Sequence, residues 1–455
     1  MSEETPPDDA RSGATAATSR DAAGRARRAR RMVFLALALV ALVTIAPRVG
    51  SWNDASRIAT IQSLVDSGSL SIEHSSITTM DKVFIGGHFY SDKPVLPQAM
   101  GAVVYAPLRA MGLKLAWDWN LSYYLITLLT VKLFWWLSLV AFEKSLGFTG
   151  LGQARRLLLT VALGLGTLAL SWSATFNSHS LAASFMGIGF SFLLRAKHAD
   201  GGVWGLFVSG LWFGLAGSSD VATLAFPAAF GCYLLFDARL RKGFLAYAAA
   251  VLLAVLPTVA VNYGISGSVV PVQLVQEYFQ FPGSPWNDSK LTGAKINRGL
   301  ALIDNGLAML LGGRGFLLYN PFSLLALPLM LLELVRRRRF AAEAAVVLVV
   351  SVIIVGYYVL WSHNFGGDSF SIRWFVPLLP LWMFFLYPLL ERPGRREWAT
   401  FFLILLVSVP IAWIGTWNPW SSGRINQVPL LSNLITMPDR AHTLWTAIVT
   451  AFSAP

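Results

Sequence analysis

The stretch SWNDASRIATIQSLVDSGSLSIEHS (51–75) follows directly on an apolar run at 33–49. From Ser56 to Leu70 the apolar residues recur mostly at spacings of three and four, which is typical of a helix with one apolar stripe. We expect this helix to lie on a membrane surface just outside a first span, with Asp54 at its N-terminal end. The carboxylate has two candidate roles, helix cap and base, and both require it to be exposed.

The composition places this stretch in a membrane protein. The chain has 455 residues, of which 55% are hydrophobic and 13% charged, whereas about a quarter are charged in soluble proteins. Apolar runs long enough to cross a hydrocarbon core of about 30 Å recur along it. The sequence therefore predicts an all-α polytopic membrane protein with about eleven transmembrane helices. The runs lie near 33–49, 119–141, 157–175, 179–195, 203–219, 221–236, 243–262, 315–335, 341–361, 374–390 and 398–415.

The net charge of +12 follows from membrane topology rather than from nucleic-acid binding. Basic residues follow every even-numbered span, and positive loops are typically cytoplasmic. Both the N-terminus and these loops are therefore expected in the cytoplasm, and the polar loops on the opposite face. We predict a disordered basic tail over 1–31, a transmembrane domain over 32–418 with outer loops 50–118 and 263–314, and an extracytoplasmic C-terminal segment over 419–455. The single Cys232 excludes an intrachain disulfide.

The stretch DKVFIGGHFYSDKPVLPQ (81–98) carries the second group of polar residues. A Gly-Gly turn joins two strand-like pieces, and Pro94 suits the first turn of an interfacial helix over 97–116. Lys93 would lie at headgroup depth, where a cation can bind an anionic lipid phosphate. Plain snorkelling of the lysine toward the headgroups is the alternative.

These two stretches together resemble membrane glycosyltransferases of the GT-C class, among them bacterial aminoarabinose lipid A transferases and protein O-mannosyltransferases. In that class the first outer loop opens with a motif like D-E-T-R-Y-A-E-I, followed by Y-x-x-K-P-P. Asp54 falls on the first acid, Arg57 on the arginine, and Lys93 on the lysine, while Ala55 and Val95 depart from the pattern. The resemblance implies a GT-C fold, Asp54 as the base toward the acceptor, and Lys93 with Arg57 binding the donor phosphate.

A third group of polar residues lies in WSHNFGGDSFSIRWFVPLLP (361–380). Its glycines permit close approach to a ligand, and Arg373 suits phosphate binding. An interfacial turn with a snorkelling arginine is the alternative. The stretch is also similar to a GG-x-S-x-G-x-R segment of bacterial GT-C-like proteins, which implies that it faces the donor. His363 and Asp368 are weaker substrate-binding candidates here.

Further candidates are single residues in outer loops or near span ends. Arg314 is a second candidate phosphate ligand at the start of a span. The weaker substrate-binding candidates are His179, Asp220, Tyr90 and Glu277. His179 is equally typical of a satisfied interfacial histidine, and Asp220 of a buried salt bridge, since acids at membrane depth are costly.

The expected reaction moves a sugar from a polyprenyl phosphate to a hydroxyl of a lipid, glycan or protein, on the outer face of a bacterial inner membrane. Cations would stabilise the leaving phosphate and an acid would take the acceptor's proton. No metal ligand set is predicted, and a divalent cation stays an open alternative. A transporter or flippase is the competing class, but the charges concentrate at one face and no internal repeat is evident. A ligase that moves a whole glycan stays open as well.

Overall fold

The computed structural model describes residues 8–199, 201–288, 290–421 and 428–437. The chain is predominantly helical, with one two-stranded antiparallel hairpin. The α-helices and strands are α1 (Asp8–Val43), α2 (Trp52–Ser67), β1 (Lys82–Ile85), β2 (His88–Ser91), α3 (Val95–Ala110), α4 (Leu121–Thr127), α5 (Leu133–Leu146), α6 (Gln153–Leu165), α7 (Leu168–Trp172), α8 (Ser178–His198), α9 (Gly202–Ser219), α10 (Ala225–Phe236), α11 (Phe244–Ser266), α12 (Leu300–Leu311), α13 (Phe316–Tyr319), α14 (Ser323–Val335), α15 (Ala341–Trp361), α16 (Leu379–Phe384) and α17 (Arg395–Trp417). The π- and 3-10 segments are η1 (Leu128–Lys132), η2 (Gly147–Thr149), η3 (Val221–Leu224), η4 (Arg241–Gly243), η5 (Val272–Leu274), η6 (Gln276–Phe279), η7 (Arg373–Leu378) and η8 (Tyr387–Leu390).

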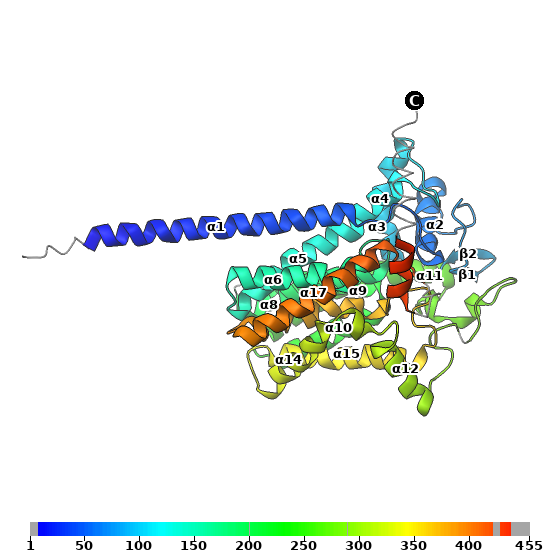
Figure 1. Cartoon of the computed structure of the whole chain (residues 1–455). Coiled ribbons are helices and arrows are strands. Elements are labelled where there is room, and N and C mark those ends of the chain that lie inside the picture. The colour runs from blue at the N-terminus through cyan, green and yellow to red at the C-terminus, as the bar shows by residue number, and fades with distance from the viewer. Residues whose placement is uncertain (1–7, 200, 289, 422–427, 438–455) are drawn as a thin grey trace, which may run out of the picture.

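The long helices form one bundle, and the polar segments gather at one of its ends. Figure 1 shows α2, the β1–β2 hairpin and α12 at that end, opposite the N-terminal end of α1. This arrangement agrees with the expectation that outer loops 50–118 and 263–314 share one face. The assignment of that face to the outer side of a membrane stays a prediction.

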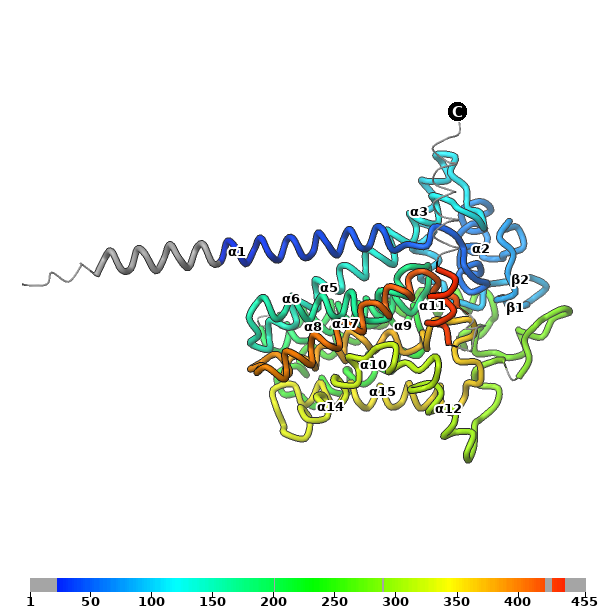
Figure 2. Tube along the Cα trace, viewed as in Figure 1, coloured from blue at the N-terminus to red at the C-terminus, as the bar shows by residue number. Residues whose placement is uncertain are grey.

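Helix α1 overlaps the segment 1–31, for which a disordered tail stays a prediction. The helix begins at Asp8 and runs to Val43, and Figure 2 shows its coloured part leading toward the polar end of the bundle. Alanine and arginine are strong helix formers, and no proline follows Pro7 in this segment. The polar tail therefore continues the apolar helix that follows it. Residues 1–7 lie outside the described residues.

All eleven apolar runs overlap helical segments, but the apolar segment Leu300–Tyr319 begins within the predicted outer loop 263–314. In the part of the chain that the structure describes, six helices are both long and apolar enough to cross a membrane. The others are too short, not apolar enough, or interrupted, as at the break between α6 and α7 around Gly166. The structure thus supports a multi-pass membrane protein, and the number of eleven spans stays a prediction.

At the other end of the bundle, the basic loop residues used to predict topology bind buried acids. Glu143 lies between Arg30 and Arg156, with N–O distances of 3.1 and 3.3 Å. The pairs Lys197–Glu343 and Arg338–Glu333 repeat the arrangement. These acids, all less than 5% exposed, hold the loops to the helix ends.

Helix α2 forms where the sequence predicts a helix, but its apolar residues are buried within the protein. Ile58 and Ile61 are fully buried, and Ile61 packs against Gly101 of α3. The apolar stripe therefore faces the protein core. The N-cap is Ser51 rather than Asp54, and Asp54 occupies the third helical position of a capping box.

The close contact between α9 and α11 predicts that a larger residue at Gly210 lowers the stability of the protein. A Cβ at Gly210 would lie 2.4 Å from the carbonyl oxygen of Tyr247, a backbone atom of the facing helix. We expect Gly210→Ala to cost about 1–3 kcal/mol by forcing the helices apart, seen as a lower unfolding temperature in detergent. Gly264→Ala is the matched control, because nothing lies within 4 Å of its Cβ position. Equal unfolding temperatures for the two variants would contradict this packing.

Candidate active site

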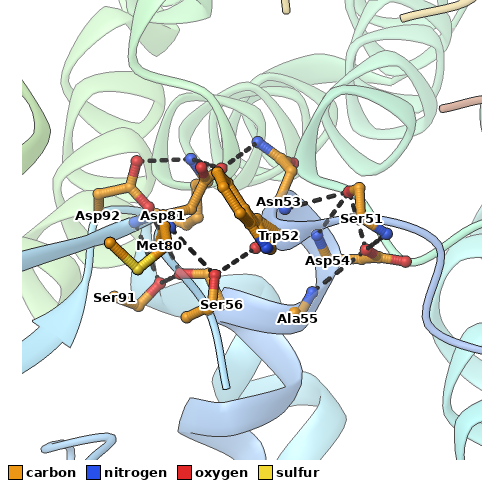
Figure 3. A network of polar contacts seen from close by, with 12 residues as sticks. Ser51, Trp52, Asn53, Asp54, Ala55, Ser56, Met80, Asp81, Ser91 and Asp92 are labelled. Atoms are coloured by element: carbon orange, nitrogen blue, oxygen red, sulfur yellow. Dashed lines mark hydrogen bonds and ion pairs between the residues drawn. The ribbon is translucent and has the colours of Figure 1, made fainter. Parts of the chain in front are cut away.

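The β1–β2 hairpin brings two carboxylates together around Lys93. Its register pairs Lys82 with Ser91 across a Gly86-Gly87 turn whose φ angles are both positive, as in two-residue hairpins. One step further along the same register, Asp81 lies opposite Asp92. Figure 3 shows this network beside the start of α2.

Lys93 bridges the two carboxylates. Its Nζ lies 2.9 Å from Asp81 Oδ2 and 2.5 Å from Asp92 Oδ2. Asn53 Nδ2 donates to the same Asp81 oxygen at 3.3 Å, and Ser56 Oγ to Asp92 Oδ1 at 3.4 Å. The first turn of α2 is thereby fixed to the hairpin.

Lys93 also lines a narrow cavity of about 70 Å³ with mainly apolar walls. The walls come from α11, from the segment 269–273, and from Tyr90 and Thr60. Tyr90, predicted as a substrate-binding residue, therefore shares the cavity with the predicted phosphate ligand. A cation beside an apolar cavity can hold an anionic headgroup while the walls accept a hydrocarbon chain.

Asp54 lies at the junction of three chain segments. Among the described residues its Oδ1 accepts from Ser51 N, Ser51 Oγ and Ala55 N, at 2.7, 2.9 and 3.2 Å. Its Oδ2 accepts from Gly50 N, Tyr123 OH and Thr175 Oγ1, at 2.9, 3.0 and 3.2 Å. These bonds join the α1–α2 connection, α4 and the α7–α8 connection, so the carboxylate is held rigidly.

The expectation of an exposed Asp54 carboxylate is wrong, because the residue is 0% exposed. Burial raises its pKa, and the hydrogen bonds from Gly50 and Ser51 partly oppose that rise. A raised pKa makes a carboxylate a stronger proton acceptor. Burial therefore makes the Asp54 carboxylate more basic and at the same time shields it from solvent.

Two guanidinium groups lie near these acids. Arg57 is 1% exposed and donates to Asn53 Oδ1 at 2.6 Å and to Ser178 Oγ at 2.8 Å. Burial lowers its pKa to about 10, and the Arg373 charge acts in the same direction. Arg373 lies over the rings of Trp172 and Trp420, and its buried Nε has no hydrogen-bond partner within the described ranges.

His179 and Asp220 form a buried pair beside the two arginines. His179 Nδ1 lies 2.7 Å from Asp220 Oδ2, where the start of α8 meets the end of α9. Asp220 also caps η3 by accepting from Ala222 N. Ser178, next to His179, binds Arg57. Asp220 is therefore in a buried ion pair, which is one of its two predicted roles. The pair also lies next to the candidate site.

The remaining predicted residues lie in the outer loops rather than in this cluster. Arg314 Nη1 donates to the Gly367 carbonyl at 2.7 Å, next to an exposed Asp368. His363 Nε2 lies 3.0 Å from the Lys295 carbonyl, and Glu277 is exposed on η6. These contacts connect loop 362–373 to loop 263–314, and the roles proposed for them stay predictions.

Sequence reasoning missed the partner acid Asp81 and the aromatic residues Tyr123, Trp172 and Trp420. The acid could have been found, because a two-residue Gly-Gly hairpin fixes which residue faces Asp92. The aromatic residues had no local signal, since they come from three distant segments. Within the described residues no group of three His, Cys, Asp or Glu side chains could hold a metal ion.

Asp92 gives a prediction for pH dependence. Burial raises its pKa, Lys93 lowers it, and Asp81 raises it. A carboxyl with a raised folded-state pKa contributes stability at low pH that is lost as the pH rises through that pKa. We therefore expect Asp92→Asn to reduce the fall in unfolding temperature above about pH 4, the ordinary carboxyl range. The exposed Asp118→Asn should keep the wild-type profile, and an unchanged profile in Asp92→Asn would contradict the assignment.

Comparison with known structures identifies the fold. ArnT from Cupriavidus metallidurans bound to undecaprenyl phosphate has a TM-score of 0.56 and 16% identity, over 92% of this chain and 69% of that one. The apo form of ArnT gives 0.55 and 18%, over 83% and 62%. The chain has the GT-C glycosyltransferase fold. An oligosaccharyltransferase from Archaeoglobus fulgidus, tethered with an acceptor peptide, gives 0.54 and 13%, over 85% and 54%.

The GT-C fold confirms the resemblance inferred from the two motifs around Asp54 and Lys93. No protein-family model matches the chain, and no curated protein matches it. The chain spans 62% of the apo ArnT chain and 54% of the oligosaccharyltransferase. The identities are low enough that the likeness concerns the fold, and activity has to be argued from the site.

Proposed function

We propose that the protein is a glycosyltransferase that moves a sugar from a polyprenyl phosphate to a hydroxyl acceptor. The observation that carries the proposal is Lys93, a cation at the wall of an apolar cavity within a GT-C fold. Lys93 would bind the donor phosphate and the cavity the first part of its hydrocarbon chain. ArnT, which has this fold, is described bound to undecaprenyl phosphate.

Two arginines would support Lys93. Besides burial, the charge of Arg373 lowers the pKa of Arg57, and both arginines lie near Asp54, Asp81 and Asp92. Positive groups preorganised around the leaving phosphate stabilise the charge that develops on it in the transition state. Arg373, which lies over two tryptophan rings and has an unsatisfied Nε within the described residues, is well suited to that contact.

Asp54 would be the base. A hydroxyl that took the place of Thr175 Oγ1 at Oδ2 would be positioned to give up its proton. Direct attack on the anomeric carbon would then invert its configuration. The reaction would take place at the polar end of the bundle, which we assign to the extracytoplasmic face of a bacterial inner membrane. Whether one sugar or a whole glycan is moved depends on the donor.

The test is the release of polyprenyl phosphate. Purified protein in lipid nanodiscs, supplied with synthetic polyprenyl-phosphate sugars, is expected to release the lipid phosphate and to transfer or hydrolyse the sugar. A transporter would instead move intact donor across sealed vesicles without breaking the sugar–phosphate bond. Movement of donor without any release would overturn the proposal.

A further inference from the structure

A second cavity, of about 370 Å³, lies beside Asp54 and shares no lining residue with the Lys93 cavity. It is lined by residues 43–50 at the end of α1 and just after it, by Trp119 before α4, by Thr175, and by residues 416–420 at the end of α17 and just after it. Its volume is within the range of about 300–1,000 Å³ that is typical of ligand sites.

This second cavity is separated from the Asp54 carboxylate only by residues that hydrogen-bond to it. Gly50 and Thr175 line it, and both donate to Asp54 Oδ2. Trp420, another lining residue, donates from its Nε1 to Thr175 Oγ1 at 3.1 Å. A Cβ at Gly50 would lie 2.6 Å from the Trp420 ring. The wall between the cavity and the carboxylate is therefore one residue thick.

The lining combines aromatic rings with polar groups. Trp119, Trp417 and Trp420 supply the rings, while Arg48 and Asn418 supply donors. A pyranose ring has an apolar C–H face and a rim of hydroxyls, so it matches rings that are edged by hydrogen-bonding groups. The Lys93 cavity, in contrast, has mainly apolar walls that suit a hydrocarbon chain.

We propose that the second cavity binds the acceptor and that the acceptor is a carbohydrate. The proposal rests on the function proposed above, in which the donor phosphate lies at Lys93. One sugar hydroxyl would replace Thr175 Oγ1 as a donor to Asp54 Oδ2. Its proton passes to Oδ2 while its oxygen bonds to the anomeric carbon of the donor. The bond between that carbon and the phosphate oxygen breaks, and the phosphate leaves with the electron pair.

Sugar binding without any donor tests the cavity. Saturation-transfer NMR on the full chain in nanodiscs would use methyl glycosides and disaccharides of glucose, mannose, galactose and arabinose, with glycerol as a non-sugar control. At least one sugar is expected to give a saturable signal. Trp119→Ala and Arg48→Gln, both at exposed positions, should weaken it about tenfold or more, consistent with the loss of an aromatic or charged contact of about 1.4 kcal/mol.

Trp204→Ala is the matched control, because Trp204 is exposed on α9 and lies outside the cavity lining. It should bind the sugar as the wild type does. A complete absence of saturable sugar signals would overturn the proposal, as would equal signals in all variants. Either result leaves the donor-release assay free to succeed, so the two proposals can fail separately.

The choice of acceptor gives a second readout. With a working donor, the enzyme is offered either the sugar that binds or the peptide acetyl-Ala-Thr-Ala-amide. Transfer to the sugar supports a carbohydrate acceptor, and Trp119→Ala should raise its KM more than it lowers kcat. Transfer to the threonine peptide in preference to the sugar would overturn the assignment.

Discussion

Asp54→Asn is expected to lower kcat for sugar transfer by about 10²–10⁴-fold, the usual contribution of a general base. The amide cannot accept a proton at the reacting position. It also presents an N–H₂ group to a site surrounded by donors, so one of the six hydrogen bonds must break. Because a buried unsatisfied donor costs about 1–3 kcal/mol, a lower unfolding temperature should accompany the loss.

Ser51→Ala separates the chemical effect from the structural one. It removes the N-cap hydroxyl of α2 and costs about 0.5–2 kcal/mol, but it leaves the carboxylate in place. We expect this variant to lose stability and to retain most of its transfer activity at temperatures where it is folded. If Ser51→Ala lost as much kcat as Asp54→Asn at equal stability, Asp54 would be a structural residue and the base would lie elsewhere.

Lys93→Ala is expected to raise the KM for the polyprenyl donor by about 10- to 100-fold. Hydrogen bonds to charged groups contribute about 1.5–3 kcal/mol, and each 1.4 kcal/mol corresponds to a factor of ten. The measurement is donor-dependent release of polyprenyl phosphate in nanodiscs. Truncating Lys93 also leaves Asp81 and Asp92 facing each other without a cation, so the hairpin should lose stability.

The double variant Lys93→Ala/Asp92→Asn distinguishes these two effects. Removing the second charge should restore much of the unfolding temperature and leave the donor KM high. Arg109→Ala is the matched cation control near the end of α3, the helix that follows Lys93, since its partner Asp66 lies outside the cluster. A normal KM in Lys93→Ala, or a raised KM in Arg109→Ala, would remove the assigned phosphate contact.

The sequence predicted the elements of this site better than their surroundings. The acidic helix start, the Gly-Gly hairpin and the lysine before Pro94 all have local signals, so α2, β1–β2 and the start of α3 were found. Burial had no such signal. Asp54 was expected at a surface because the chain around it is polar, whereas Tyr123 and Thr175, both distant in sequence, cover it.

The same limit applies to the tail and the span count. Low hydrophobicity predicts disorder before residue 32, and this stays a prediction, whereas helix propensity continues across that boundary into α1. Apolar runs located most helical segments of the bundle, but not α12, which lies within the predicted outer loop 263–314. Apolar runs could not distinguish helices that cross a bilayer from helices that enter it only partly. That distinction depends on helix length and on packing against neighbouring helices.

The position of Lys93 between Asp81 and Asp92 has a consequence for selectivity among anions. A lysine already neutralised by two carboxylates attracts free inorganic phosphate only weakly, since any newcomer must compete with both ion pairs. A lipid-linked phosphate brings additional binding energy from its hydrocarbon chain, at about 0.8 kcal/mol per buried CH₂. Soluble phosphates and nucleotide sugars lack that contribution, so the protein would discriminate against them even where they are abundant.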